Sequence, residues 1–367
     1  MHHTPPPTSS GRTGRQTRQL RTWGASALIA VLACVATACG GNSDTATTVA
    51  LDKPVSSTVP ADTTLAIGDP VTQVALQASG LLQKIPFHIK FANLSGGPQT
   101  MEAFRGHALD LASVADIPPI FANWTGLKVH IVAAKYREDP VHHPVYELGT
   151  APGSDITKLS DIKGKKVAFS PGQAQGALVL RLLKKLGLSQ DDVQLVEIPS
   201  TLDVYNNALA AHQVDAAPIG GVYLKRYLAD YGSKGGNVLR TGIRDDAGFL
   251  YAPDSVLANP AKAAAIKVYV QYWAQAQRWI KDHPQEWLKA YYEDNQGLDA
   301  VDGKWLIKNA GTPVIPKNWT KAIAEHQQTI DLLSEEEDQP DTKAQDLWDM
   351  RYQHVAGDAY AASGGSR

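Results

Sequence analysis

The stretch NLSGGPQTMEAFRGHALDLASVADIPPIF, residues 93–121, guides the interpretation of the whole chain. Its Gly-Gly-Pro turn at 96–98 predicts a helix over 99–105, because proline lacks the N–H that the first turn of a helix leaves unpaired. A short apolar strand over 109–114 follows, and Asp116 is a typical N-cap for a second helix. Two helix N-termini therefore follow turns of small residues, where free N–H groups attract anions.

Strand and helix patterns alternate on both sides of this stretch. Apolar strands at 65–67, 87–91 and 128–134 are separated by amphipathic helices, which predicts an α/β fold with mostly parallel sheets flanked by helices. A second unit of the same kind begins near residue 151, with strands at 167–170, 193–198, 214–219 and 238–239 and helices at 173–186, 202–211 and 222–231. Ligands on such sheets gather at the carboxyl ends of the strands.

The C-terminal third is predicted to be helical. The main expected helix, 261–282, carries an aromatic stripe at helical spacing that we interpret as core rather than as a ligand platform. Further helices are expected at 285–292, 302–308 and 319–333, and residues 346–367 are expected to be a C-terminal helix and tail.

The N-terminal 38 residues have the layout of a secretory signal peptide. Four arginines between residues 12 and 21 precede an apolar segment at 25–38 that is too short for a permanent transmembrane helix. The segment ends in Ala-Thr-Ala before Cys39, which resembles a lipobox and predicts lipidation of Cys39; Cys34 is the alternative site. Residues 39–62 are then expected to be a flexible tether between the lipid and the folded body.

Charge and cysteine content exclude several classes of protein. Removal of residues 1–38 takes away four arginines and no acidic residue, which changes the formal net charge from −2 to −6 and argues against a nucleic-acid partner. Both cysteines lie at or before residue 39, so the exported body has no disulfide and no thiolate site. No motif calls for a cofactor, and no Gly-x-Ser-x-Gly elbow indicates a hydrolase.

One loop could hold a metal. Glu138, Asp139, His142 and His143 place four possible ligands close together in sequence. We favour a solvent-exposed loop, and the metal receptor remains an alternative.

The chain carries Gly-Pro-Gln at 97–99, Leu-Ala-Ser at 111–113 and Asp-Ile-Pro-Pro-Ile-Phe-Ala at 116–122. These segments resemble the aliphatic sulfonate-binding proteins, which belong with the nitrate- and taurine-binding receptors of bacterial ABC importers. The segment LSDIKGKKVAF at 159–169 resembles the start of that family's second lobe, and Val-Asp-Ala at 214–216 its closing strand. The likeness covers about residues 64–333.

The resemblance implies a two-lobed type II periplasmic binding protein fold with two hinge crossings, near residues 146–151 and 241–249. Lobe 1 would comprise residues 63–148 and 247–345, and lobe 2 residues 149–246. The ligand, an organic anion for which an aliphatic sulfonate is the best candidate, would bind between the lobes at helix N-termini. The resemblance thereby implicates a set of turn residues: Asp69, Gln73, Gly97, Gln99, Ala115, Asp116, Gln173, Gln175, Gly220 and Gly221.

The second lobe departs from the family pattern at two turns. Many relatives carry a serine-rich turn where this chain has Gln173 and Gln175, whose amides can also donate to an oxyanion. Many also carry Trp-Asp-Pro where this chain has Gly220 and Gly221, which predicts a wider cleft floor and a larger ligand. Cationic residues of the first lobe, Lys135 and Arg137, are expected to lie outside the cleft.

The expected function is that of an exported, lipid-anchored and monomeric receptor that delivers its ligand to an ABC permease and its ATPase by closing about a hinge. A receptor for nitrate, taurine or another small nitrogen or sulfur solute is the alternative. An enzyme similar to thiamine-pyrimidine synthases, on the same fold, is the alternative of another class; those enzymes carry a cysteine-rich segment that the exported body lacks.

Overall fold

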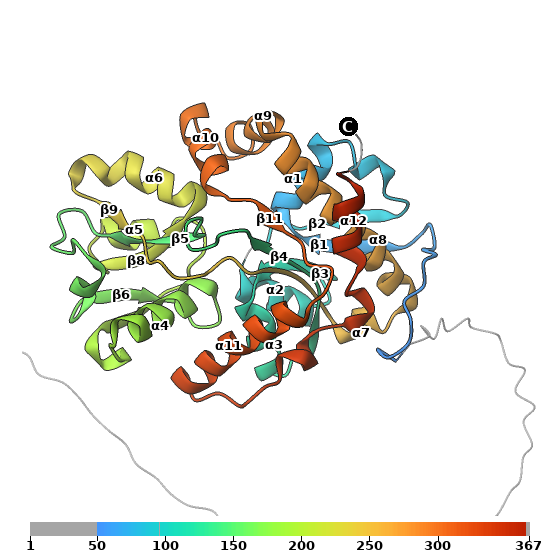
Figure 1. Ribbon diagram of the computed structural model, residues 1–367, viewed down its shortest axis with the longest axis horizontal. Helices are drawn as coiled ribbons and strands as arrows, with labels where there is room; N and C mark the ends of the chain where they lie inside the picture. The colour runs from blue at the N-terminus through green and yellow to red at the C-terminus, as the bar shows by residue number, and fades with distance from the viewer. Residues whose placement is uncertain (1–49, 95, 365–367) are drawn as a thin grey trace, which may run out of the picture. The chain divides into compact units, whose positions relative to one another are not determined.

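Two mixed β-sheets, joined by two chain crossings, organise the residues that the computed structural model describes, 50–94 and 96–364 (Figure 1). These residues belong to one unit of the chain, 46–367. The predicted signal peptide, Cys34 and Cys39 lie outside the described residues. None of the described helices is both long enough and apolar enough to cross a membrane.

The first sheet contains six strands of the described chain, in the order β11-β4-β10-β3-β1-β2. Its strands are β1 (Thr64–Gly68), β2 (His88–Phe91), β3 (Leu111–Ala115), β4 (Val129–Arg137), β10 (Gly248–Pro253) and β11 (Pro313–Val314). Strand β1 pairs in parallel with β2 and β3, as the alternating pattern predicted. Strand β10, which enters from the second crossing, runs antiparallel to both β3 and β4, and β11 is antiparallel to β4.

The second sheet contains five strands of the described chain, in the order β7-β6-β8-β5-β9. They are β5 (Tyr146–Thr150), β6 (Lys166–Phe169), β7 (Gln194–Glu197), β8 (Ala216–Gly220) and β9 (Asn237–Leu239). Strand β6 is parallel to β7 and β8, whereas β5 is antiparallel to β8 and β9. The α/β fold of the prediction is confirmed. The sheets are nevertheless mixed, because the strands next to the crossings run against their neighbours.

Helices cover both sheets (Figure 1). Around the first sheet lie α1 (Pro70–Ala78), α2 (Gly97–Arg105), α3 (Ile117–Trp124), α7 (Asp254–Leu257), α8 (Pro260–Asp282), α9 (Pro284–Trp287), α11 (Thr320–Glu336) and α12 (Val355–Ala362). Around the second lie α4 (Ala174–Leu186), α5 (Val204–Ala210) and α6 (Gly221–Tyr231). A π-helical turn, η5 (Leu288–Glu293), extends α9, and α10 (Ala300–Asn309) contacts both η5 and α6.

The long helix α8 supplies the centre of the larger core. Its Tyr269 and Trp273 are buried beside Leu65 and Ile67 of β1, so the aromatic stripe is core as predicted. A smaller cluster around Ala168, Leu209 and Tyr227 supports the second sheet. Burial of apolar surface on this scale is the main stabilising contribution to such a fold.

Two neighbouring carboxylates hold the crossings together. The Asp245 carboxylate accepts hydrogen bonds from the backbone N–H groups of Val145 (2.8 Å) and Tyr146 (2.7 Å). Asp246 accepts one from the N–H of Arg137 at 2.6 Å. Strand β5 begins at Tyr146 and pairs within the second sheet, although the sequence placed residues 146–148 in lobe 1. We therefore propose that the first crossing comprises residues 138–145 and the second residues 240–247.

Candidate functional site

A cavity of about 490 Å³, hereafter the cleft cavity, lies between elements of the two sheets. The first-sheet side contributes Gly97 from the start of α2 and Ala115 from the end of β3. The second-sheet side contributes Gln173 and Gln175 from the start of α4, together with Gly220 and Gly221 from the start of α6. The structure thus brings six of the ten sequence-predicted residues to one cavity.

Three of the helices that begin at this cavity have no side-chain cap. The N-cap residues of α2, α4 and α6 are Gly96, Gln173 and Gly220, and none accepts a side-chain hydrogen bond from its own helix. The first N–H groups of a helix have no partner within the helix and carry a partial positive charge. Their convergence on one cavity makes it suited to an anion.

Close approach of the two sides depends on glycine at residue 97. A Cβ there would lie 2.8 Å from Pro118 Cγ and 3.2 Å from the carbonyl oxygen of Gly172, across the cleft. The Gly-Gly-Pro turn at 96–98 therefore lies at the contact between the two halves.

Four predicted residues do not line the cleft cavity. Asp69 is buried and accepts a hydrogen bond from the Thr72 N–H at 3.1 Å, so its carboxyl group caps α1 instead of leaving that helix start free for a ligand. Gln73 is half-buried on α1, and Gln99 is exposed on α2. Asp116 is the fourth.

Asp116 occupies the N-cap position of α3 but makes no cap hydrogen bond, so the predicted capping role is wrong. Its carboxylate instead accepts from Thr329 Oγ1 at 2.8 Å and lies 3.3 Å from Arg181 Nη2. The first turn of α3 contains Pro118 and Pro119, which have no N–H to offer an anion. The start of α3 therefore contributes shape rather than donors.

Of the two cations that the sequence placed outside the cleft, Arg137 is part of its wall, whereas Lys135 lines only an adjoining cavity. Arg137 lines the cleft cavity and also an adjoining cavity of about 590 Å³, and Lys135 lines the adjoining one. The Arg137 Nη1 donates to the carbonyl oxygens of His143 and Pro144, each at 2.7 Å. No carboxylate of the described residues lies within 4 Å of a side-chain nitrogen of either cation. Burial lowers the pKa of both groups.

Tyrosines supply much of the remaining wall of the cleft cavity, and no sequence pattern predicted them there. They are Tyr146, Tyr205, Tyr223, Tyr291 and Tyr292. Burial raises the pKa of each of these phenols, so they present neutral hydroxyls and apolar ring faces.

The second-lobe turns differ in part from the expectation. A Cβ on Gly220 would lie 2.1 Å from the carbonyl oxygen of Val145, so this residue packs on the crossing and cannot carry a side chain into the cleft. The Gln173 Oε1 accepts from Ser200 Oγ at 2.6 Å, which leaves its amide N–H groups available. The Gln175 amide already donates to the Ser200 carbonyl at 3.3 Å.

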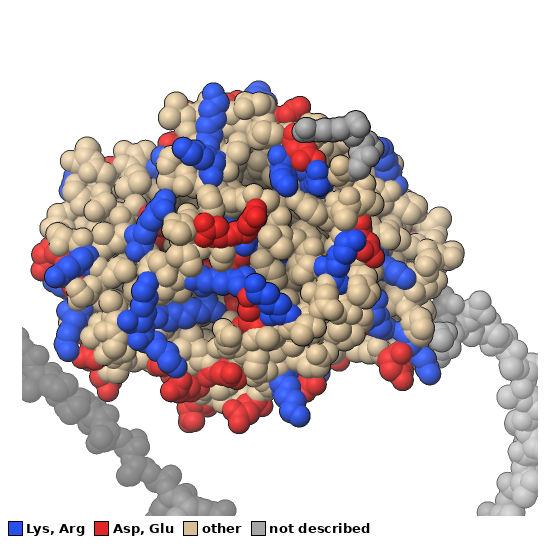
Figure 2. Space-filling model, viewed as in Figure 1, with Lys and Arg blue, Asp and Glu red and all other residues tan. Residues whose placement is uncertain are grey.

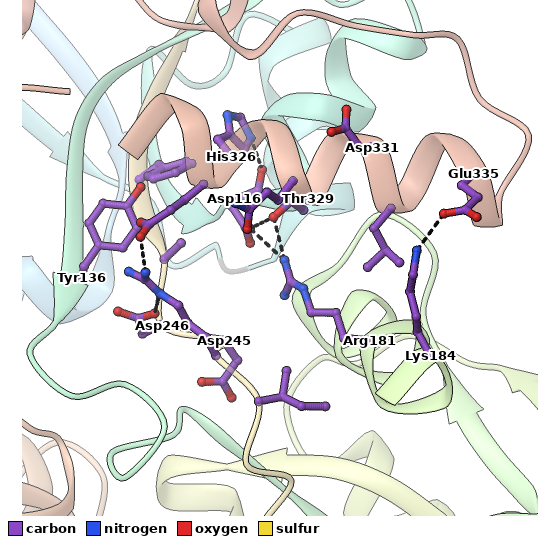
Figure 3. A pocket seen from close by; sticks show the side chains of 17 residues that line it. Asp116, Tyr136, Arg181, Lys184, Asp245, Asp246, His326, Thr329, Asp331 and Glu335 are labelled. Atoms are coloured by element: carbon purple, nitrogen blue, oxygen red, sulfur yellow. Dashed lines mark hydrogen bonds and ion pairs between the residues drawn. The ribbon is translucent and has the colours of Figure 1, made fainter. Parts of the chain in front are cut away.

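A cavity of similar size, about 600 Å³, is lined by α4, α11 and the second crossing, and we call it the latch cavity (Figure 3). Its arginine and lysine side chains are each paired with carboxylates that also line it. Arg181 reaches from α4 to Asp116 and donates to Thr329 Oγ1 at 2.7 Å, Lys184 lies 2.7 Å from Glu335, and Arg244 bonds Asp246 and Glu325. In the face shown in Figure 2, positive and negative side chains are correspondingly mixed.

The loop at 138–143, for which a metal site was the alternative interpretation, makes contacts within itself. His142 Nδ1 lies 2.8 Å from an Asp139 oxygen, and both side chains are exposed. Among residues 50–94 and 96–364, no group of three or more His, Cys, Asp or Glu side chains is arranged to hold a metal ion.

Comparison with known proteins gives consistent matches. The profile of the family described as NMT1/THI5 like matches residues 98–286. An Escherichia coli (strain K12) protein named for binding aliphatic sulfonates is 30% identical over 251 residues, which cover 67% of this chain and 74% of that protein.

Two solved structures share the fold. The alkanesulfonate-binding protein SsuA from Xanthomonas axonopodis pv. citri, bound to MOPS, aligns with a TM-score of 0.66 and 22% identity over 82% of this chain and 98% of that one. The periplasmic aliphatic sulphonate binding protein SsuA from Escherichia coli aligns with a TM-score of 0.62 and 26% identity over 81% and 92%.

Proposed function

Because the chain belongs to the NMT1/THI5-like family, we propose that it is an extracytoplasmic solute-binding protein of an ABC importer that binds an organic anion, an aliphatic sulfonate in the first instance, in the cleft cavity. The relatives compared above are binding proteins by name rather than enzymes. The mechanism is closure of the two halves about the crossings, followed by delivery of the ligand to a permease and its ATPase.

The observation that carries the proposal is the cation Arg137, which lines the same cavity as three uncapped helix starts. None of the described carboxylates lies within 4 Å of its guanidinium nitrogens. A sulfonate oxygen at this position would receive charge-assisted hydrogen bonds. The tyrosine walls and the volume of about 490 Å³ favour an anion with an organic tail over bare nitrate.

A second candidate ligand is an aminosulfonate such as taurine. The Asn206 Nδ2 donates to the Tyr223 carbonyl at 2.8 Å, whereas its Oδ1 is buried with no hydrogen-bond partner among the described residues. Asn206 lines the cleft cavity, and an ammonium group on the ligand would satisfy this acceptor.

Calorimetry on the exported body tests the assignment. We expect pentanesulfonate to bind in the micromolar range or tighter, and Arg137→Gln to weaken binding by at least tenfold, because a hydrogen bond to a charged group contributes about 1.5–3 kcal/mol. The matched control is Arg105→Gln, an exposed cation on α2 that bonds Glu102. Absence of binding for pentanesulfonate, taurine and nitrate would reject the proposal.

Membrane attachment through Cys39 is part of the same proposal and rests on the sequence pattern before it. In cells fed labelled fatty acid, Cys39→Ala should lose the label and appear in the soluble fraction, whereas Cys34→Ala should keep it. Loss of the label only in Cys34→Ala would move the lipid site to that residue.

A further inference from the structure

The cavity that adjoins the cleft cavity, hereafter the tail cavity, has a volume of about 590 Å³ and continues the binding space toward the first sheet. The two cavities share eight lining residues: Val71, Val114, Ala115, Arg137, Val145, Tyr146, Tyr291 and Tyr292. A ligand held at the helix starts can therefore extend past Arg137 into the tail cavity.

Lys135 is the distinctive group of the tail cavity. Lys135 and Arg137 are two residues apart on β4, so their side chains leave the same face of the strand about 7 Å apart. The Lys135 Nζ donates to Gln277 Oε1 at 2.8 Å, which is a neutral acceptor. An ammonium group has three donors, so this single contact leaves capacity for a ligand.

The acidic residues of the tail cavity are already engaged elsewhere. Asp245 accepts hydrogen bonds from the backbone N–H groups of Val145 and Tyr146, and Asp246 accepts from the Arg137 N–H and Arg244 Nε. Asp69 is close enough to act electrostatically on Lys135, but it does not line the cavity and caps α1. Burial raises the pKa of the Asp69 carboxyl, which favours its neutral form.

Part of the tail cavity's wall is aromatic and apolar. The rings of Trp287 and Tyr291 stack with centroids 4.5 Å apart and planes inclined by 3°. Tyr291 and Tyr292 line both cavities, and Ile280 and Ile307 complete the apolar side. A flat ring would lie against such a surface with favourable contact.

We propose that the tail cavity is a second anion subsite, which binds the carboxylate of an aromatic sulfonate through Lys135 while the sulfonate lies at the helix starts beside Arg137. This inference rests on the proposed function and specifies its ligand class. The ligand is a dianion with its two charged groups separated by an aromatic ring.

The test compares benzenesulfonate with 4-sulfobenzoate, which differ only in the carboxylate. By calorimetry at pH 7, we expect 4-sulfobenzoate to bind the unmodified protein at least about tenfold more tightly. Lys135→Met should abolish this difference while benzenesulfonate affinity stays the same. Lys128→Met, an exposed lysine just before the same strand, is the matched control and should keep the difference.

Equal affinities for the two ligands in the unmodified protein would overturn the inference. So would a Lys135→Met protein that keeps the preference for 4-sulfobenzoate, or one that loses both ligands equally, since that indicates a structural role. If Lys135→Met does not fold, as judged by thermal unfolding, Lys135→Gln replaces it with the same expectations. Pentanesulfonate separates the two proposals. If it binds but 4-sulfobenzoate binds no better than benzenesulfonate, only the second anion subsite is rejected. If none of the three ligands binds, the proposed function is rejected as well.

Discussion

Removal of the Arg181 guanidinium should weaken ligand binding without loosening either half of the protein. Arg181 projects from α4 of the second half and meets Asp116 and Thr329, which belong to α3 and α11 of the first (Figure 3). When the halves separate, Arg181 and Asp116 would both be hydrated. The contact therefore stabilises the closed arrangement and not the fold of either half.

The magnitude follows from the burial of the two groups. The side chains of Arg181 and Asp116 are 21% and 10% exposed, so the pair lies between an exposed ion pair and a fully buried one. In Arg181→Met, Asp116 keeps only the Thr329 hydroxyl at 2.8 Å of its two side-chain contacts. A hydrogen bond to a charged group contributes about 1.5–3 kcal/mol, and the 3.3 Å distance places this one at the lower end, which corresponds to a Kd about tenfold higher.

Calorimetry measures the Kd of Arg181→Met. Stopped-flow displacement should show that most of the lost affinity comes from faster ligand release. The matched control is Lys184→Met one turn further along α4, whose pair with Glu335 has side chains 56% and 68% exposed; its Kd should change by less than about threefold. Two results would refute the reasoning: an Arg181→Met Kd within threefold of the unmodified protein, or a melting temperature that falls as much without ligand as with it.

Three further predictions concern the cavities. Burial lowers the pKa of Lys135 to about 8, so in the ligand-free protein its ammonium group loses a proton as the pH rises through that value. Binding of 4-sulfobenzoate should therefore be accompanied by proton uptake at pH 8.5 but not at pH 6, which calorimetry in buffers of different ionisation enthalpy measures. Proton uptake that persists in Lys135→Met would contradict this prediction. Gln173→Ala should raise the sulfonate Kd about fivefold and Gln175→Ala less, because the Gln175 amide already holds Ser200; the reverse order in calorimetry would contradict the assignment. Gly220→Ala should lower the melting temperature by several degrees, because its Cβ would overlap the Val145 carbonyl; a protein as stable as the original would show that the crossing gives way.

The sequence predicted most of the elements but neither β5 nor β10, because the expected crossings near residues 146–151 and 241–249 overlap both strands. Gly-Pro turns and apolar periodicity placed α2 and α4 to within two residues of their observed starts. Strands β5 and β10 are antiparallel to their neighbours because each enters its sheet from a crossing. That direction depends on the edge at which the chain arrives, which no property of the strand's own residues determines.

The residues of the candidate site could likewise be predicted only in part. Residues at the starts of helices could be predicted, because a glycine turn after a strand is a local signal, and Gly97 and Gln173 both line the cleft cavity. Arg137 and Lys135 could not, because their exposure to the cavities depends on the crossings that Asp245 and Asp246 hold together about 100 residues later in the chain. The alternation of cationic residues at the end of β4 was the available signal. For Asp116 the local pattern was misleading: it predicts a helix cap, but Arg181 and Thr329, both distant in sequence, bind its carboxylate.

The position of α4 links the two cavities. This helix carries Gln173 at its start into the cleft cavity and Arg181 two turns later into the latch cavity, and its residues between them are mostly buried. Under the proposed mechanism, a single rigid helix would move both contacts together when the halves close. Because the ligand and the Arg181–Asp116 pair each favour the closed arrangement, thermodynamic linkage requires that each strengthens the other by the same factor. Loss of the pair therefore appears as lost ligand affinity even though Arg181 is not part of the cleft-cavity wall, and saturation with ligand should in turn restore most of the closed population in Arg181→Met.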